Sequence, residues 1–401
     1  MKYVQLKKTK ATIAKDIFDI EDELTARYQQ GVIIDQAEQD NWKTRIEEAS
    51  FGRNTVEFGI GGYPIILVKF PKISYAELGF GWPDTTHDAF IVNGVEKNGI
   101  YIAKYLSSFV GSGVDARIVS LRGVDPGASK NFDTALLHHS QMGPGFHMVT
   151  NIEYALMGQL SKAKNFQPRG NNYYGKDYSK QSETGTPTYM DGTNVGRTAT
   201  GSGPLSWFMY GSPFGTADLN GNVWEWCAGM RIQDGEIQIL PNNDAADNTK
   251  DLTATSALWK AIMPDGTLVA PGAAGTLKYD SSQPLTDDGS TQTKGPAIVR
   301  TALQNPAPPA WLNSYYDYNY GTFQTLAAEV NVPDILKQYG LFPIDSNHGA
   351  DYLYVRNYGE RLPIRGGAWG SASFAGVFAL YLYILRSNSS TDIGSRAAFV
   401  I

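Results

Sequence analysis

The last 37 residues, 365–401, constrain what this chain can fold into more than any other segment. Residues suited to a rigid frame, such as Gly366, Trp369 and Arg396, alternate there with side chains that share no volume, charge or polarity. A packed core needs matched shapes, whereas a binding surface tolerates mixtures and often places aromatic rings among small residues. The segment therefore predicts a ligand-contacting face held by a stiff scaffold.

The composition sets limits on that scaffold and on its partners. Of the 401 residues, 42% are hydrophobic and 18% are charged, which is ordinary for a globular protein. The net charge of −6 argues against nucleic acid as a partner, because phosphate binding needs a basic face, and also against anionic membranes. The single cysteine, Cys227, excludes an intramolecular disulfide, so the fold must be held by packing alone.

The start of the chain gives an expectation about location. It carries positive charges but no apolar stretch of a secretory signal, and the longest apolar run, 376–385, is too short to cross a bilayer. We expect cytoplasmic synthesis without membrane insertion, followed by a place in the virion if the protein belongs to a phage tail.

Helical spacing is clearest near the start of the chain. Between residues 11 and 49, apolar side chains recur at three- and four-residue steps, which predicts two short amphipathic helices in an N-terminal segment, 1–55. These helices either pack on the rest of the chain or serve oligomerisation or attachment.

The pattern beyond this segment is mixed. Residues 89–109 predict a β-hairpin, and Thr150 with Glu153 forms a capping box that starts a helix. Residues 241–345 hold many prolines and little periodicity, which predicts a loop-rich insertion on a surface.

Few residues fit a catalytic role. His138, His139 and His147 form the only histidine cluster, and their spacing does not bring them together as metal ligands, so we expect ordinary surface or helix-capping histidines. No histidine is placed to activate Cys227, so a buried, inert thiol is expected.

The run DLNGNVWEWC, residues 218–227, places Glu225 between two tryptophans. A carboxylate in such surroundings must find an arginine, backbone donors or a cation. Arg365, Arg386 and Arg396 are candidate partners, while the oxygen-rich turn 220–222 would suit calcium. The sequence leaves both alternatives open.

Three motifs in order, DLNGNVWEWC, RGGAW (365–369) and IGSRAAF (393–399), resemble the formylglycine-generating-enzyme, or sulfatase-modifying-factor, branch of the C-type lectin fold. Within that branch, the tail and the segments 167–178 and 211–226 resemble the variable proteins of diversity-generating retroelements, which include phage tail-tip adhesins. The resemblance implies an α+β chain with a C-type lectin-like ligand-binding domain at 56–401, an insertion at 241–345 and a variable region at 365–401.

In that family, adenine-directed mutagenesis of a template rewrites the C-terminal codons. Changing the adenines of AAC or AAT cannot give Lys, Glu, Gln, Met or Trp, and none of these residue types occurs between Gly370 and Ser395. Strand alternation would turn Tyr381 and Tyr383 outward and Leu382 inward. Together with Phe374, these two tyrosines are the expected anchors of binding. The resemblance implies that the variable, ligand-contacting positions are Ala368, Gly370, Ser371, Ser373, Phe374, Tyr381, Tyr383, Ile384, Leu385, Ser390, Asp392 and Ser395.

The resemblance also bears on cofactors. The family's calcium site maps onto Asn220, Gly221, Val223 and Glu225, so calcium is an optional ion and no cofactor is expected to be required. The enzymatic branch uses a cysteine pair near the C-terminus or an iron site of three histidines, and this sequence matches neither.

The expected function is therefore non-catalytic binding of a protein or cell-surface ligand by a phage or prophage adhesin. A homo-oligomer would multiply the strength of a weak site. The alternatives are an oxidoreductase of the sulfatase-modifying type and a purely structural tail protein.

Overall fold

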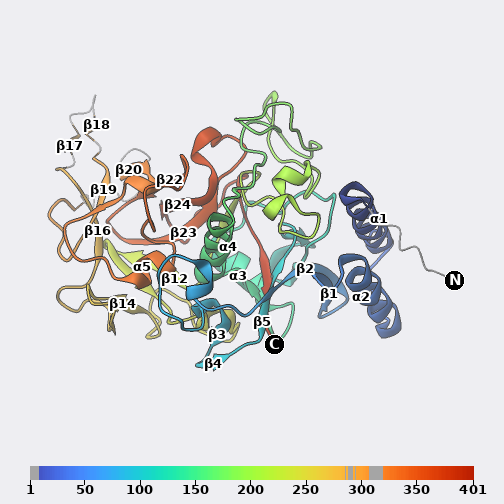
Figure 1. Ribbon diagram of the computed structural model, residues 1–401, viewed down its shortest axis with the longest axis horizontal. Coiled ribbons are helices and arrows are strands. Elements are labelled where there is room, and N and C mark those ends of the chain that lie inside the picture. The colour runs from blue at the N-terminus through green and yellow to red at the C-terminus, as the bar shows by residue number, and fades with distance from the viewer. Residues whose placement is uncertain (1–8, 285, 288–291, 294, 307–318) are drawn as a thin grey trace.

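Two β-sheets and a pair of N-terminal helices organise the chain, of which the computed structural model describes residues 9–284, 286–287, 292–293, 295–306 and 319–401 (Figure 1). The fold is mixed α+β with strands predominating, in agreement with the predicted α+β class. None of the described helices is long and apolar enough to cross a membrane. The helices are α1 (Lys10–Tyr28), α2 (Gln36–Ser50), α3 (Phe132–Ser140), α4 (Asn151–Ala163) and α5 (Asp334–Gln338).

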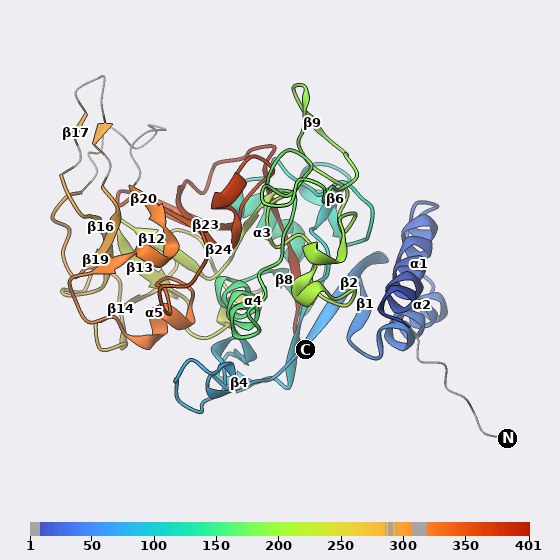
Figure 2. The ribbon, with the colours of Figure 1, turned by 45° about the horizontal axis from the view of Figure 1, so that its top comes forward.

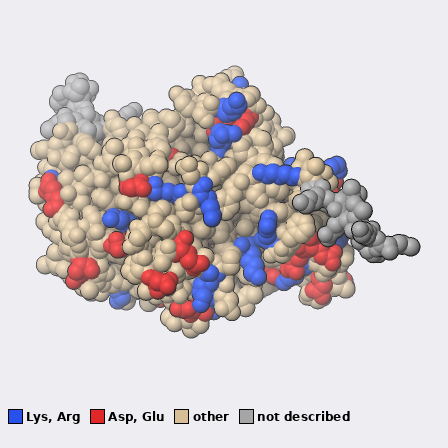
Figure 3. All heavy atoms as spheres, viewed as in Figure 1, with Lys and Arg blue, Asp and Glu red and all other residues tan. Residues whose placement is uncertain are grey.

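The helix pair α1 and α2 lies at one end of the molecule (Figure 1). Each helix starts with a capped backbone amide: the Thr9 side chain accepts from the Thr12 N–H, and Asp35 accepts from the Glu38 N–H. Their inner faces are buried in one cluster that also holds side chains of the β-strands and of residues 205–217. The helices therefore pack on the rest of the chain, the first of the two alternatives. In the view of Figure 3, acidic and basic side chains lie together at this end, and several are paired, as Asp19 is with Lys15 and Glu23 with Arg45.

A buried ion pair fixes α1 in place. Lys104 Nζ lies 2.7 Å from Glu21 Oε1, and both side chains are fully buried. The Tyr105 hydroxyl donates to the other oxygen of Glu21 at 2.6 Å. Both carboxylate oxygens are thus satisfied by residues that directly follow the strand β5.

The smaller sheet brings the two halves of the chain together. Its order is β1-β2-β5-β26-β8, so the last strand of the chain lies between two early ones. The β1–β2 turn uses Gly61 and Gly62, both with positive φ, as a tight hairpin requires. The strands are β1 (Asn54–Gly59), β2 (Tyr63–Pro71), β5 (Gly99–Ala103), β26 (Ala397–Phe399) and β8 (Phe146–Met148).

The larger sheet contains 13 strands among the described residues and follows the path β20-β22-β24-β23-β12-β13-β16-β19-β21. Strand β11 joins β23 to β25, while β14 and β15 extend from β13. The strands are β11 (Trp224–Trp226), β12 (Met230–Gln233), β13 (Glu236–Ile239), β14 (Lys260–Ile262), β15 (Leu268–Val269), β16 (Lys278–Ser281), β19 (Ala297–Arg300), β20 (Asn319–Thr322), β21 (Ala327–Ala328), β22 (Tyr352–Val355), β23 (Glu360–Gly366), β24 (Gly376–Ile384) and β25 (Ile393–Ser395).

Segment 241–345 corrects the expectation of a loop-rich surface insertion. It supplies several strands of the larger sheet, and Trp259, Leu277 and Tyr279 within it are fully buried. The prolines suggested loops because they lie between these short strands. Each strand contains too few apolar residues to show a period.

Short two-stranded hairpins lie outside the two sheets described above. The pair β3 (Ile91–Val92) and β4 (Val95–Glu96) turns through Asn93-Gly94, both with positive φ, as predicted within 89–109. The other pairs are β6 (Ser108–Val110) with β7 (Arg117–Val119), β9 (Met190–Asp191) with β10 (Asn194–Val195), and β17 (Thr286–Asp287) with β18 (Gln292–Thr293).

Helix α4 lies at the centre of the molecule (Figure 1). The predicted capping box is present: the Glu153 N–H donates to Thr150 Oγ1, and the Thr150 N–H donates to the Glu153 carboxylate at 2.9 Å. Most of the helix is buried, and Gly158 allows the ring of Phe378 on β24 to approach closely. The helix thereby supports one face of β24.

Glu225 and Arg396 tie the two sheets together. The guanidinium donates to both oxygens of the carboxylate, at 2.7 and 2.9 Å, and both side chains are buried. Arg396 also donates to the carbonyl oxygens of Ala103, Lys104 and Ala217. One residue near the C-terminus thus joins β11, β5 and the loop before β11.

The Lys104–Glu21 pair generates a stability prediction. Lys104→Met leaves a buried carboxylate without its cation, and loss of one partner of a buried pair costs about 3–5 kcal/mol. The matched control is Lys15→Met, which breaks the exposed pair with Asp19, and exposed pairs contribute only about 0–1 kcal/mol. Urea unfolding measures both, and equal losses would show that the buried pair does not anchor α1.

Candidate functional site

Strand β24 presents two different faces. Leu380 and Leu382 are fully buried in the main hydrophobic core. Tyr381 and Tyr383 project from the opposite face, where they pack with Trp224 and its neighbours. The predicted alternation of this strand is therefore confirmed.

Tyrosines from three adjacent strands form a row on that second face. The strand register places Tyr320 of β20 opposite Tyr354 of β22, and Tyr354 opposite Tyr381 of β24. The ring centroids are 5.8 Å apart in the first pair and 4.0 Å apart in the second. Tyr320 is 43% exposed and Tyr381 is 9% exposed, so exposure rises toward β20 at the edge of the sheet path.

Further rings extend the row into a surface. The Phe374 ring, on a short turn at Ala372–Phe374, is 38% exposed and lies 3.9 Å from the Tyr352 ring. Tyr352 lies 5.7 Å from Tyr354, and Tyr383 lies 5.5 Å from Tyr381. The two tyrosine pairs have centroid spacings within the usual range of attractive aromatic pairs, about 4.5–7 Å, and the Phe374 and Tyr352 rings lie closer together. We call the set Tyr320, Tyr352, Tyr354, Phe374, Tyr381 and Tyr383 the tyrosine face.

Half of the tyrosine face was missed from the sequence. Tyr320, Tyr352 and Tyr354 lie outside the segment 365–401 and reach the face only through strand pairing. A local signal existed for β22, because Tyr352 and Tyr354 alternate with Leu353 and Val355, which are buried in the main core.

Tyr381 has a different position from the one predicted. Its ring lies between those of Trp224, at 3.9 Å, and Tyr354, at 4.0 Å. With only 9% of the residue exposed, it supports its neighbours from below and offers little surface to a ligand. Tyr383 is half-buried and Phe374 is exposed, so these two predicted anchors remain accessible.

Three other predicted contact residues lie in the interior. Ala368, Ile384 and Ser395 are buried, so a ligand cannot touch them in this conformation. Ala368 belongs to a tight turn in which its N–H donates to Ser371 Oγ. Ile384 packs with the tryptophans of β11, and Ser395 pairs in β25 against Trp226.

The remaining predicted positions fall into two groups. Gly370, Ser371 and Ser373 lie beside Phe374 on an accessible loop. Ser390 and Asp392 instead stabilise the return to β25: the Ser390 hydroxyl donates to Asp392, whose carbonyl accepts from the Trp224 N–H. The structure therefore brings the first group to the tyrosine face. Leu385 follows β24 and is half-buried.

Of the proposed calcium ligands, Glu225 is already paired with an arginine, whereas Asn220, Gly221 and Val223 would contribute only backbone oxygens. Arg396 occupies both oxygens of Glu225, and the Asn220 side-chain oxygen accepts from Asn172 at 2.9 Å. The charge of Glu225 is thus balanced by an arginine, which is the other alternative that the sequence left open. Gly221 and Val223 belong to the same packed turn, whose glycine approaches the Asn171 carbonyl too closely for a side chain.

Catalytic groups do not assemble in the described part of the chain. Cys227 is buried, and burial raises the pKa of its thiol, which keeps it protonated and inert. His138, His139 and His147 are buried, which corrects the expectation of surface histidines; His147 bonds Glu153 at 2.9 Å. Among the described residues, no three His, Cys, Asp or Glu side chains are grouped to hold a metal.

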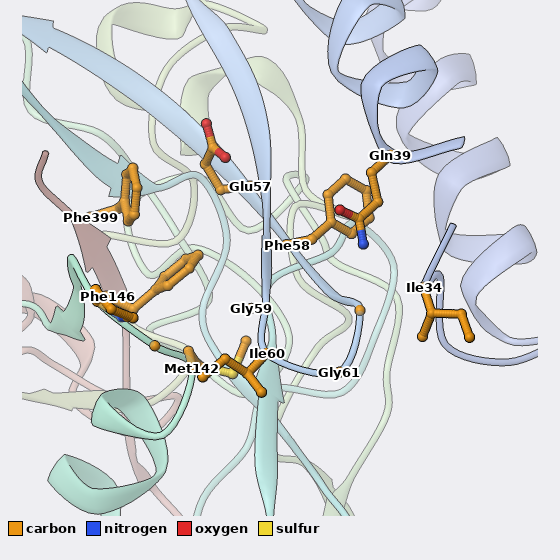
Figure 4. Close-up of a pocket in the computed structure, with 13 residues that line it drawn as sticks. Ile34, Gln39, Glu57, Phe58, Gly59, Ile60, Gly61, Met142, Phe146 and Phe399 are labelled. Atoms are coloured by element: carbon orange, nitrogen blue, oxygen red, sulfur yellow. The ribbon is translucent and has the colours of Figure 1, made fainter. Parts of the chain in front are cut away.

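A cavity of about 410 Å³ opens where α2 meets the smaller sheet (Figure 4). Ile34, Ile60, Met142, Phe146 and Phe399 give it a largely apolar lining. Its one carboxylate, Glu57, is paired with Lys43 at 2.6 Å. The cavity therefore offers packing surface without an acid–base pair.

A buried carboxyl lies under the tyrosine face. Asp351, just before β22, accepts the Phe378 N–H at 2.7 Å and so links β22 to β24. A Cβ at Gly376 would lie 2.1 Å from its Oδ1, so the carboxyl occupies the space of the missing side chain. Burial raises the pKa of Asp351 to about 8.

The raised pKa of Asp351 predicts a pH dependence of stability. A folded state that binds the proton more tightly is stabilised at acid pH, and this contribution is lost as the pH rises from the ordinary pKa of 3.8 through about 8. Asp351→Asn keeps an acceptor for Phe378 but cannot titrate, so its melting temperature should fall less than that of the wild type over this range. Asp191→Asn, at an exposed position, is the control, and parallel curves for all three proteins would contradict the assignment.

The arrangement around Glu225 predicts indifference to calcium. An ion bound only by the folded state would add about 2.7 kcal/mol at a hundred times its Kd. Calorimetric melting with calcium and with a chelator should give the same midpoint, because Arg396 already balances the carboxylate. A calcium-dependent rise would show that an ion binds elsewhere or displaces Arg396.

Comparisons with known proteins were made by sequence and by structure. No family model matches the sequence, and no curated protein matches it. The chain is similar to the solved structures of the Major Tropism Determinant P3c and U1 variants, with 12% and 11% identity and TM-scores of 0.30 and 0.31. Each alignment covers 84% of this chain and 63% of the determinant, so the chain spans less than two thirds of that protein.

A third solved structure is Treponema denticola variable protein 1, with 11% identity and a TM-score of 0.28 over 86% of this chain and 98% of that one. The solved structures to which the chain is similar thus include two variants of a tropism determinant and a variable protein.

Proposed function

We propose that the chain is a non-catalytic binding protein that contacts its ligand through the tyrosine face. The observation that carries this proposal is a run of six neighbouring aromatic rings, five on strands of one sheet and Phe374 on the adjoining turn, with Tyr320 and Phe374 more than a third exposed. Exposed aromatic clusters of this kind mark interaction surfaces.

Tyrosine suits this role for energetic reasons. It offers a large contact area with a polar hydroxyl, and it loses little conformational entropy because it has only two side-chain torsions. Here all five tyrosines of the face stand on paired strands, and neighbouring rings restrict them further. These side chains therefore lose little further conformational entropy when the ligand binds.

The face divides into a part built by β20 and β22 and a part contributed by residues 370–374 and Tyr383. The second part lies in the segment in which the retroelement resemblance places the variable residues. Residues of this part can differ without disturbing the main core, because Gly370 and Phe374 are exposed. Diversification of these positions would change the ligand while the tyrosines of β20 and β22 stay constant.

The biological role that fits this arrangement is adhesion to a protein or cell-surface ligand, as a phage or prophage adhesin. A virion location and assembly into a homo-oligomer belong to the same proposal, since several copies would strengthen a weak site through effective concentration. No cofactor takes part in it.

We expect the accessible residues of the tyrosine face to contribute to ligand binding and its buried residue, Tyr381, to contribute to stability. Tyr320→Ala and Tyr383→Ala should weaken binding about thirtyfold, the effect of losing about 2 kcal/mol at an interface anchor, with little change in melting temperature. Tyr381→Ala should lower stability by about 3–5 kcal/mol, as for other large aromatic residues removed from a core. Tyr28→Ala, on α1 at the far end of the molecule, is the control for binding.

The probe for these variants is a set of cyclic peptides selected on the wild-type protein from a random displayed library. Surface plasmon resonance then gives their affinities for each variant. Peptides that bind Tyr320→Ala and Tyr383→Ala as well as the wild type would show that the preferred binding surface lies elsewhere and would refute the proposal.

A further inference from the structure

We propose that the loop 171–178 forms a second wall of the ligand site and that the residue at position 370 controls access to it. The wall consists of Tyr173, Tyr174 and Tyr178, here called the loop tyrosines. This inference rests on the proposed function, because it places the wall beside the tyrosine face.

The loop and the C-terminal segment are joined on both sides of Gly370. The Tyr174 N–H donates to the Trp369 carbonyl at 2.7 Å, and the Ala372 N–H donates to the Asn172 carbonyl at 2.8 Å. In Figure 2 the loops of this region lie beside the segment that leads into β24. The loop tyrosines are thus held next to the accessible residues 370–374.

Two buried asparagines make the loop rigid. The side-chain oxygen of Asn171 accepts from the Gly175 N–H, and that of Asn172 accepts from the Tyr178 N–H, each at 2.7 Å. The Asn222 N–H donates to the Asn171 carbonyl at 2.6 Å, which ties the loop to the turn before β11. The loop is therefore held by hydrogen bonds within itself and to the turn before β11.

The loop tyrosines remain exposed in spite of this rigidity. Tyr173, Tyr174 and Tyr178 are 37%, 37% and 47% exposed, and the Tyr173 ring lies 5.7 and 5.5 Å from the other two. Tyr174 has a φ of 50°, which is uncommon for a bulky side chain. Strain of this kind concentrates where a protein holds a group ready for a ligand.

Gly370 differs from the glycines around it. A Cβ at Gly366, Gly367 or Gly376 would lie 2.7, 2.3 or 2.1 Å from a neighbouring atom, so packing requires glycine there. At Gly370 the nearest atom to a Cβ would be the Tyr174 hydroxyl oxygen, at an ordinary contact distance of 3.5 Å. Gly370 has no positive φ, so its backbone also accepts other residues.

A side chain at position 370 would therefore contact Tyr174 as its nearest neighbour. Any side chain there starts in contact with the Tyr174 ring, and a longer one covers it. Glycine leaves the ring and its hydroxyl open, which fits an uncharged ligand with an apolar protrusion and a hydrogen-bonding group beside it. Position 370 is thus a specificity-determining residue, which acts by opening or covering the loop tyrosines.

The test uses the cyclic peptides selected on the wild-type protein. Tyr174→Asn removes the ring but keeps a residue that tolerates positive φ, and Gly370→Tyr covers the ring. Each should weaken peptide binding about tenfold, and the double variant should be no weaker than either single variant, because both changes remove the same contact. Gly370→Ala, which is too small to cover the ring, should bind within about threefold of the wild type.

The outcomes distinguish this inference from the proposed function. Wild-type affinity in both Tyr174→Asn and Gly370→Tyr, with loss in Tyr320→Ala, would reject the second wall and leave the tyrosine face intact. Strictly additive losses in the double variant would also reject it, because they would mean that positions 174 and 370 act separately. Peptides that bind both Tyr320→Ala and Tyr383→Ala normally would reject the proposed function itself. The melting temperature of each variant is measured to check that it folds.

Discussion

The buried ion pair of Glu225 and Arg396 is the interaction on which the rest of the structure depends. Besides Glu225 on the larger sheet, Arg396 donates to the carbonyls of Ala103 at the end of β5, of Lys104, and of Ala217 in the loop before β11. It therefore bonds groups of both sheets. A buried charge pair adds little net stability but is costly to break, so it favours one arrangement over its competitors. Strand β11, fixed in this way, carries Trp224, which in turn supports Tyr381 beneath the tyrosine face.

The proposed binding face and the core share a single strand. On β24 the leucines enter the main core and the tyrosines form the face, so the same backbone serves both purposes. Because successive side chains point to opposite sides, the half-buried Tyr383 can differ while the inward leucines and the buried Tyr381 keep the sheet packed. The accessible loop 370–374 extends this freedom beyond the strand, and the tyrosines of β20 and β22 provide contacts that do not depend on it.

Local patterns in the sequence predicted local structure well. The spacing of apolar residues gave α1 and α2, the Thr150–Glu153 box gave the start of α4, and alternation gave the two faces of β24. Long-range pairing could not be predicted in this way: Tyr320 and Tyr354 meet Tyr381 only through strand registers between distant segments. The same limit hid the strands within 241–345, the choice of Arg396 as the partner of Glu225, and the burial of Ala368, Ile384 and Ser395.

Gly376 shows how packing limits substitution within the C-terminal segment. It lies between the exposed Phe374 and the face-forming Tyr381, yet the Asp351 carboxyl fills the space into which its side chain would extend. Any residue that replaced this glycine would have to displace the buried carboxyl. The exposed positions 370 and 374 carry no such requirement, so tolerance of substitution changes sharply within a few residues of the same segment.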